Sequence, residues 1–350
     1  WVRPLLPTWH PAAGAGDNGV LRTARRVLRA GRSHLAWLRV AWLLRSERPD
    51  VVQWSDWRFP VDGWMVHQLA RRAGAPVMVA LVHTPQPLNE QRRGGGLFKT
   101  GRLLDRALDL GYSTVDATLV LGERSADDLL ATHPGARGVE IVPHGDESIF
   151  SDSEPTDVVA TAPVALFFGT LSANKGLEEL LEAFADVHAR MPSARLVIAG
   201  SPSGEVDVAE LRRRAGPATG VEWRLGYVPV QEVADLFQSA RLVVTPYRYA
   251  NVSGVVHLAH TFARPVVATA VGDLPATVAD GVSGLLVPQG DRAALGEALY
   301  RLLTDPARAA ALGAAGRARL AERSWPLVAE RVETLYESCA AARRNGAARP

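Results

Sequence analysis

The sequence lacks the features that mark several classes of protein. Its 350 residues include one cysteine, Cys339, which excludes an intramolecular disulfide and a cysteine-based zinc site. No apolar run is long enough to span a bilayer, and no signal peptide is visible. The net charge is only +2, so the composition predicts no nucleic-acid partner. So few cysteines are typical of a reducing compartment, and we predict a cytoplasmic protein.

Hydrophobic residues are plentiful, and they are patterned. They make up 47% of a chain in which 22% of residues are charged, which indicates a globular protein of about two domains. Short apolar runs alternate with segments of helical period, which predicts parallel sheets covered by helices. The expected strands are 50–54, 76–83, 117–122, 139–145, 164–168, 195–200, 221–225, 241–246, 265–269 and 284–288. The expected helices include 62–73, 101–111, 291–303, 306–322 and about 325–344.

Residues 151–162 read SDSEPTDVVATA, which has no helical period and indicates a linker between domains. We therefore expect an N-terminal domain over 1–150, a second domain over 163–324 and a closing segment over 325–350. Ligands of such sheets bind at the carboxyl ends of the strands, so two domains that face each other would hold a site in the cleft between them.

Residues 14–19 read GAGDNG, which has the Gly-x-Gly-x-x-Gly spacing of a dinucleotide-binding turn. That spacing indicates a phosphate site only when a strand precedes it. Here the preceding segment contains Pro4, Pro7 and Pro11, which are incompatible with a central strand. We interpret it as a loop before a helix rather than as a phosphate site.

The segment FFGTLSANKG, residues 167–176, has the context that GAGDNG lacks. A strand enters it and an amphipathic helix leaves it. Gly169 permits a sharp turn, Gly176 begins the helix and Lys175 brings a positive charge to an end that favours anions. An ordinary loop with a solvated lysine explains the same letters equally well. The apolar face of the following helix is formed by Leu177, Leu180, Leu181 and Phe184.

A second half-motif lies in residues 246–269, where a strand ends and Ser253 and Gly254 begin an apolar helix. Ser253 could simply cap that helix. Alternatively, the N-terminus of this helix points at the anion expected beside Lys175. Two helix N-termini and one lysine could hold a diphosphate.

Residues 163–340 resemble the donor domain of a GT-B-fold glycosyltransferase of family 4, the glycosyl transferases group 1. The matching pieces are FFGTLSANKGLEELLEAF, LVIAGS, GYVP, ARLVVTPY, ARPVVATAVGDLP and DGVSGLLVPQGD. VVQW, LVHT and VPHG resemble the acceptor domain more weakly, and SWPLVAERVETLY resembles the closing helix. The resemblance implies two doubly wound Rossmann-like α/β domains that face a cleft.

The resemblance also implies a reaction, in which a sugar moves from a nucleotide-diphosphate sugar to a hydroxyl of a glycan, lipid-linked or small-molecule acceptor. No cofactor or metal is expected, since no Asp-x-Asp and no convincing ligand spacing occurs. The donor-binding positions that it implies are Gly169, Thr170, Lys175, Gly200, Tyr227, Val228, Asn251, Ser253, Gly254 and Val255.

The sequence departs from the family pattern at several of these places. Thr170 stands where the family has an arginine, and Ala250 and Leu258 stand where it has two glutamates. The chain is closer to a branch that lacks these acids. A non-catalytic member that binds a nucleotide sugar or a partner protein is the alternative.

Acceptor-side candidates are His83, which ends a strand and resembles the histidine that the family places beside the donor sugar, and Glu90. A histidine without a role and a solvated glutamate are the competing interpretations.

Residues 1–48 hold nine arginines and two acids. Residues 20–48 could form a helix that lies on an anionic membrane, or merely a solvated face. The side chains expected to pack inward are Val27, Leu28, Leu35, Leu38, Val40, Leu43 and Leu44. Because the family opens with a strand and a Gly-rich turn, we also expect the first βα unit to be absent from this chain.

Overall fold

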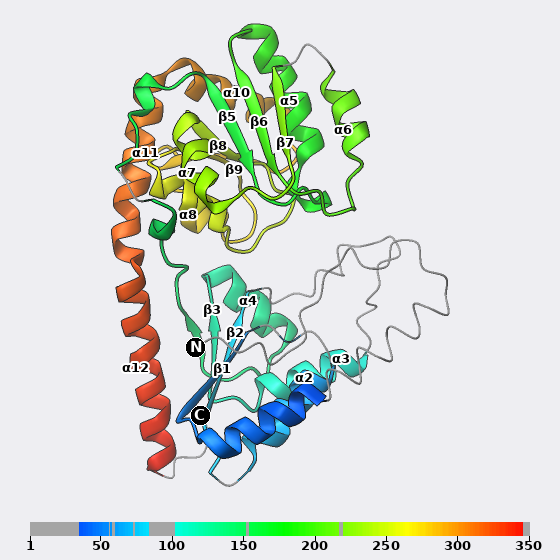
Figure 1. Cartoon of the computed structure of the whole chain (residues 1–350), viewed down its shortest axis with the longest axis vertical. Helices are drawn as coiled ribbons and strands as arrows, with labels where there is room; N and C mark the ends of the chain where they lie inside the picture. Colours follow the sequence, from blue (N-terminus) through cyan, green and yellow to red (C-terminus); the bar gives the residue numbers. More distant parts are fainter. Residues whose placement is uncertain are drawn as a thin grey trace, which may run out of the picture. The chain divides into compact units, whose positions relative to one another are not determined.

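The structure is a computed structural model that describes residues 35–55, 57, 60–72, 74–83, 102–151, 154–216 and 220–345. These residues form two compact units. The first unit holds the described residues up to Val120, then Ala126–Ile141 and those from Val332 onward, and the second holds Leu121–Ser125 and Val142–Arg331. Each unit has its own parallel sheet (Figure 1).

The sheet of the first unit runs in the order β1-β2-β3-β4, with every neighbouring pair parallel. Its strands are β1 (Val51–Ser55), β2 (Val77–Val82), β3 (Ala117–Val120) and β4 (Val139–Ile141). The helices are 35–47, α2 (Pro60–Ala70), α3 (Arg102–Tyr112) and α4 (Glu123–Thr132). β4 is shorter than the expected strand 139–145, because Pro143 has no N–H to continue the ladder.

The sheet of the second unit is larger and runs β10-β9-β8-β5-β6-β7, again all parallel. Its strands are β5 (Val164–Phe168), β6 (Arg195–Gly200), β7 (Val221–Leu225), β8 (Leu242–Thr245), β9 (Val266–Thr269) and β10 (Gly284–Val287). Its helices are α5 (Leu177–Arg190), α6 (Val208–Ala215), α7 (Val230–Ser239), α8 (Gly254–Thr261), α9 (Leu274–Thr277), α10 (Arg292–Thr304) and α11 (Pro306–Leu320). α12 (Trp325–Arg344) follows.

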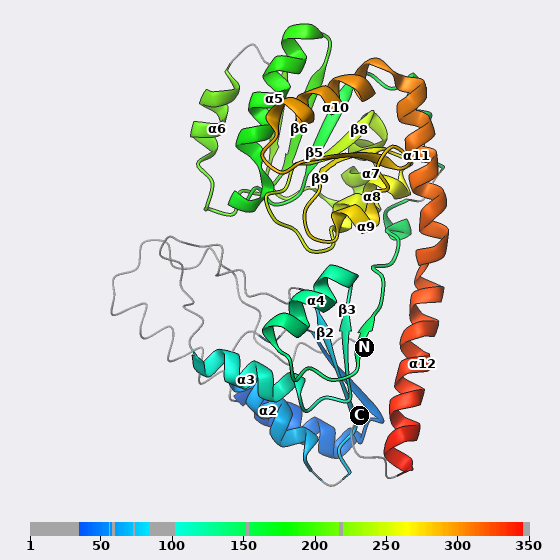
Figure 2. The ribbon, with the colours of Figure 1, turned by 180° about the vertical axis from the view of Figure 1, so that it is seen from behind.

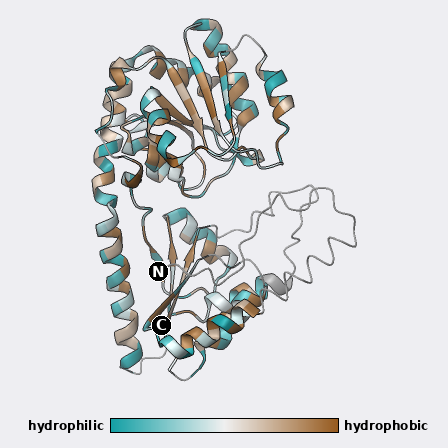
Figure 3. Ribbon diagram, in the orientation of Figure 1, coloured by the Kyte–Doolittle hydropathy of each residue, from teal (hydrophilic) through white to brown (hydrophobic). Residues whose placement is uncertain are grey.

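Helices cover both faces of this second sheet, as right-handed crossovers require. α5 packs against α6 and α10, and α8 packs against α11 (Figures 1 and 2). The predicted apolar face of α5 is buried in full, and the strands are largely hydrophobic (Figure 3). The sheet therefore lies between two apolar helix layers, which gives the unit a rigid core.

The α/β prediction is confirmed, and each expected strand appears within a few residues of its expected bounds. α4, α6, α7 and α9 were not expected from the sequence. GAGDNG and the proposed missing βα unit lie outside the described residues.

The orientation predicted for the helix 35–47 is wrong at Leu35 and Leu38, whereas Leu44 packs against the core as expected. Leu35 and Leu38 are 61% and 63% exposed, whereas Trp37 is buried. The indole Nε1 of Trp37 donates to Asp62 Oδ1 at 3.0 Å, and its ring lies 5.0 Å from the ring of Trp54. The helix turns Trp37 inward, because a buried indole removes more surface from water than a leucine does and its N–H finds a partner there. Val40 is buried as expected.

Replacement of the fully buried Phe184 of α5 tests this core. Phe184→Ala should lower the free energy of unfolding of the second unit by about 3–5 kcal/mol, because it leaves a cavity beneath the sheet. Ile149→Ala, at a side chain that is 71% exposed, should change it by less than about 0.5 kcal/mol. Native-state hydrogen exchange of β5 amides measures both, and equal effects would contradict the packing described here.

Candidate functional site

The strand order of the second sheet changes direction between β5 and β8. From β5 the chain continues to β6 on one side, and from β8 it continues to β9 on the other. The loops that leave the carboxyl ends of two such strands part from each other and open a crevice, where ligands of this kind of sheet bind. Here those loops are residues 169–176 and 246–253, the two segments that the sequence singled out.

The two loops are in direct contact. Gly176 has φ of +65°, and a Cβ placed on it would lie 1.9 Å from the carbonyl oxygen of Pro246. The N–H of Arg248 donates to the carbonyl of Asn174 at 2.8 Å, and Asn174 Nδ2 donates to the carbonyl of Tyr249 at 3.2 Å. These contacts fix the spacing of the loops.

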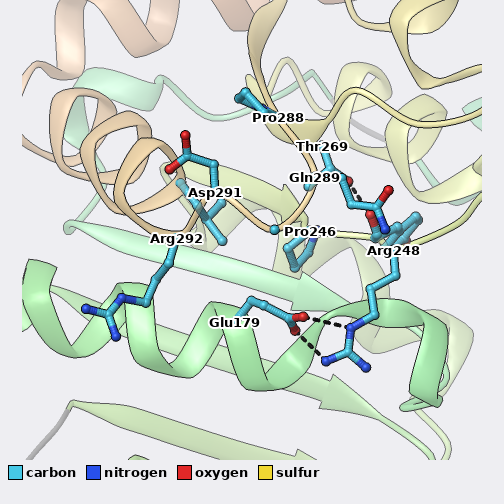
Figure 4. Close-up of a pocket in the computed structure, with 11 residues that line it drawn as sticks. Glu179, Pro246, Arg248, Thr269, Pro288, Gln289, Asp291 and Arg292 are labelled. Atoms are coloured by element: carbon cyan, nitrogen blue, oxygen red, sulfur yellow. Dashed lines mark hydrogen bonds and ion pairs between the residues drawn. The ribbon is translucent and has the colours of Figure 1, made fainter.

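Arg248 fastens the second loop to the start of α5. Its Nε and Nη2 donate to the two carboxylate oxygens of Glu179 at 2.7 and 2.8 Å, and Nη2 also meets Glu178 at 2.9 Å (Figure 4). These carboxylates raise the pKa of Arg248. Burial by itself raises the pKa of Glu179, but the hydrogen bonds and charge of Arg248 outweigh it and leave that pKa lowered. The positive charge of Arg248 is therefore balanced locally.

Lys175 lies between the loops. Its ammonium group stands 3.6 Å above the centre of the ring of Tyr247, which is buried, and a cation in that position is attracted to the ring face. Within the described part of the chain, no carboxylate forms an ion pair with Lys175. The lysine is thus held in place without being neutralised.

The N-terminus of α8 lies beside the turn that follows β5. Ser253 occupies the N-cap position, but its side chain makes no capping hydrogen bond, so the capping interpretation is wrong for that hydroxyl. Gly169 has φ of +120°, and a Cβ on it would lie 3.9 Å from Val255 Cγ2. The turn after β5 and the first turn of α8 are therefore neighbours.

The ends of β6 and β7 extend this edge. A Cβ on Gly200 would lie 1.9 Å from the carbonyl oxygen of Gly169, and the N–H of Gly226 donates to the carbonyl of Gly200 at 3.0 Å. Tyr227 follows and is 79% exposed, while Val228 packs against the core. Three successive strand ends thus lie side by side.

The remaining expected positions are more scattered. Thr170 is exposed beside Gly169, and Asn251 accepts a hydrogen bond from Tyr249 Oη at 2.8 Å. His83 lies in the first unit, just after β2, with Nδ1 3.5 Å from Ser55 Oγ. Glu90 lies outside the described residues.

None of the described helices is long and apolar enough to cross a membrane. No three His, Cys, Asp or Glu side chains of the described ranges group into a metal site.

Comparison with known proteins agrees with this architecture. Residues 162–305 match the family Glycosyl transferases group 1. Sucrose-phosphate synthase from Thermosynechococcus elongatus superposes with a TM-score of 0.72 at 24% identity, over 88% of this chain and 79% of that one. Anabaena HepE, in complex with UDP-glucose, superposes with a TM-score of 0.71 at 15% identity, over 92% and 90%.

Curated relatives are similar over most of their length. A GDP-mannose-dependent monoacylated alpha-(1-6)-phosphatidylinositol monomannoside mannosyltransferase of Corynebacterium glutamicum is 34% identical over 289 residues, which are 77% of this chain and 72% of the relative. Alpha-maltose-1-phosphate synthase of Mycolicibacterium smegmatis is 29% identical over 324 residues, 85% and 81% of the two chains.

Two parallel-sheet units with these structural neighbours define a GT-B glycosyltransferase fold. The chain belongs to the glycosyl transferases group 1. It is a glycosyltransferase.

Sequence reasoning missed the residues that hold the site together. Tyr247 lies under Lys175, and Arg248 binds Glu179 across the loops. The only signal was the position of PYRY directly after a predicted strand, because the partner carboxylates lie 69 and 70 residues away.

A pair of glycine substitutions tests the loop contact. Gly176→Ala should destabilise the second unit by well over the 1–2 kcal/mol of a left-handed residue, because the new methyl group meets Pro246. Gly204→Ala, at a φ of +77° with open space around it, should cost only that backbone term. Native-state hydrogen exchange measures both, and an equal loss would show that the close approach is unimportant.

Proposed function

We propose that the second unit holds the diphosphate of the donor at the switch point between β5 and β8. The observation that carries this proposal is Lys175, held over Tyr247 between two fastened loops and next to an α8 N-terminus that no side chain caps. A helix N-terminus and an ammonium group both favour a phosphate.

Each expected residue then has a physical role. Gly169 allows the backbone to come close to a phosphate, and Ser253, Gly254 and Val255 present the start of α8 to it. The base lies over Gly200, Tyr227 and Val228, where the exposed ring of Tyr227 offers a stacking surface. Catalysis comes from holding the sugar in position and from stabilising the diphosphate as it departs.

The nature of the donor follows from the relatives only as a proposal. One relative is named as GDP-mannose-dependent, and HepE was crystallised with UDP-glucose. We therefore propose a UDP- or GDP-sugar and an acceptor hydroxyl on an inositol phosphate, a sugar phosphate or a lipid-linked glycan, in a bacterial cytoplasm. His83 acts on the transfer step and Glu90 contacts the acceptor. No metal is required.

The sequence alone left a non-catalytic binding role open, because Thr170, Ala250 and Leu258 are uncharged, but membership of a transferase family favours turnover. Release of UDP or GDP from a panel of nucleotide sugars separates the two. Release in the presence of an acceptor supports the transferase, and tight binding with no release for any donor and acceptor supports the binding role.

Variants of three regions test the site. Lys175→Ala should weaken nucleoside diphosphate binding about ten- to a hundredfold, because a charge-assisted contact is worth about 1.5–3 kcal/mol. His83→Ala should leave that binding nearly intact and slow transfer. Gly14→Ala and Gly16→Ala should change neither quantity.

Calorimetric titration of UDP and GDP, together with a turnover assay, measures these effects. Lys175→Arg is the matched control and should retain most of the affinity. Full binding by Lys175→Ala together with lost binding by Gly14→Ala would move the site to the GAGDNG loop.

We also propose that the helix 35–47 contacts an anionic membrane. Its exposed stripe consists of Leu35, Leu38 and Trp42, which is 67% exposed, with Arg39 and Arg45 beside it. Arg39 and Arg45 face outward as expected, but Leu35 and Leu38, which were expected to pack inward, are exposed beside them. Apolar side chains flanked by arginines suit the boundary of an anionic bilayer.

Vesicle flotation tests the stripe. Leu38→Gln with Trp42→Ser should lower binding to vesicles that contain phosphatidylserine, and added salt should lower the binding of the wild type. Val282→Ser, at an exposed residue of the second unit, is the control. Equal binding by the wild type and the double variant would contradict the proposal.

A further inference from the structure

A short segment of the second unit, residues 144–147, lies along one face of α8. His144 stacks on His257 of α8, with ring centroids 4.7 Å apart and planes 15° from parallel. The N–H of Glu147 donates to Thr261 Oγ1 at 3.3 Å, one turn further along the helix. The segment is anchored at its other side, where Trp325 Nε1 donates to the carbonyl of Asp146 at 2.8 Å.

Two titratable side chains lie beside Gly254, the first residue of α8. A Cβ on Gly254 would lie 3.4 Å from Glu147 Oε1 and 3.7 Å from His144 Nε2. Both groups are mostly buried, with 24% of the His144 side chain and 18% of the Glu147 side chain exposed. They therefore stand beside the helix N-terminus where the diphosphate is proposed to lie.

The protonation sites of His144 are assigned by its partners. Nδ1 lies 2.8 Å from the carbonyl oxygen of Gly145, which can only accept, so Nδ1 carries the hydrogen. Nε2 is then the atom at which a second proton is taken up. It lies 3.8 Å from Glu147 Oε1, so protonation creates an ion pair.

The charged groups around His144 allow it to be protonated when an anion arrives. Burial raises the pKa of Glu147, and a positive charge on His144 opposes that rise. Asp146 adds a further negative charge from the same segment. Burial lowers the pKa of His257 to about 2, so the ring under His144 stays neutral, and its two nitrogens have no hydrogen-bond partner in the described structure. The charge of Arg323, before α12, also lowers the pKa of His257.

We propose that His144 is a further ligand of the donor diphosphate, and that it binds the phosphate in its protonated form with Glu147 as its counter-ion. The proposal rests on the proposed diphosphate site. It adds a second positive charge, at the start of α8, to that of Lys175. His144 lies in VPHG, which resembles the acceptor domain of the family, but the sequence assigned no role to His144 or Glu147.

The proposal predicts that a proton is taken up when the diphosphate binds. The negative charge of a phosphate beside Nε2 favours the charged form of the imidazole, so the complex holds more protons than the free protein and its ligand do separately.

Titration calorimetry of UDP and GDP into the full chain measures this uptake. At about pH 7.5, the binding heat in two phosphate-free buffers of different ionisation enthalpy gives the protons exchanged. Comparison with a variant at the same pH cancels the protons of the nucleotide itself. His144→Gln should lose the uptake and bind about tenfold or more weakly. Glu147→Gln should partly lower both the proton uptake and the affinity for the nucleotide.

Two control variants distinguish a failure of the role of His144 from a failure of the proposed diphosphate site. His188→Gln, on α5 and bonded only to the carbonyl of Ala194, should keep the full uptake. Lys175→Ala should bind weakly yet still take up the proton. If the wild type binds the nucleotide and His144→Gln takes up as many protons as the wild type does, the role of His144 is overturned and the diphosphate site still stands. No binding by the wild type, or full affinity in Lys175→Ala, overturns the diphosphate site as well.

Discussion

The approach of Gly176 to the carbonyl oxygen of Pro246 is the constraint on which the candidate site depends. It brings the loop after β5 within reach of the loop after β8, which the parallel order of the sheet has already placed next to it. Only a residue without a side chain, at positive φ, fits there. Asn174 and Arg248 then add hydrogen bonds across the same seam, and Lys175 is left over the ring of Tyr247.

Two cations, Arg248 and Lys175, lie where the two loops meet, and their surroundings differ. Arg248 is paired with two glutamates and contributes rigidity, whereas Lys175 rests on an aromatic face and keeps its charge available. Thr170 brings no charge to this place, so the proposed site meets an anion with Lys175, the start of α8 and His144. We expect such a site to bind an anion through preorganised groups.

Local patterns predicted most of the fold. The apolar period of Leu177, Leu180 and Phe184 gave α5 its buried face, and short β-rich runs gave the strands. The sequence also placed Lys175 and Gly254 at helix starts. The sequence did not predict orientations that depend on distant partners. Trp37 faces inward because its indole N–H donates to Asp62 and its ring packs near that of Trp54. Arg248 and His144 escaped notice because Glu179 and His257 are far away in the chain.

Hydrogen–deuterium exchange of the full chain, with and without saturating UDP or GDP, tests the central claim most directly. The account predicts slower exchange for the amides of residues 169–176 and 253–256, because the diphosphate covers the two loops that meet at the switch point between β5 and β8. Protection confined to other segments, such as residues 14–19 or the loops after β9 and β10, would contradict it.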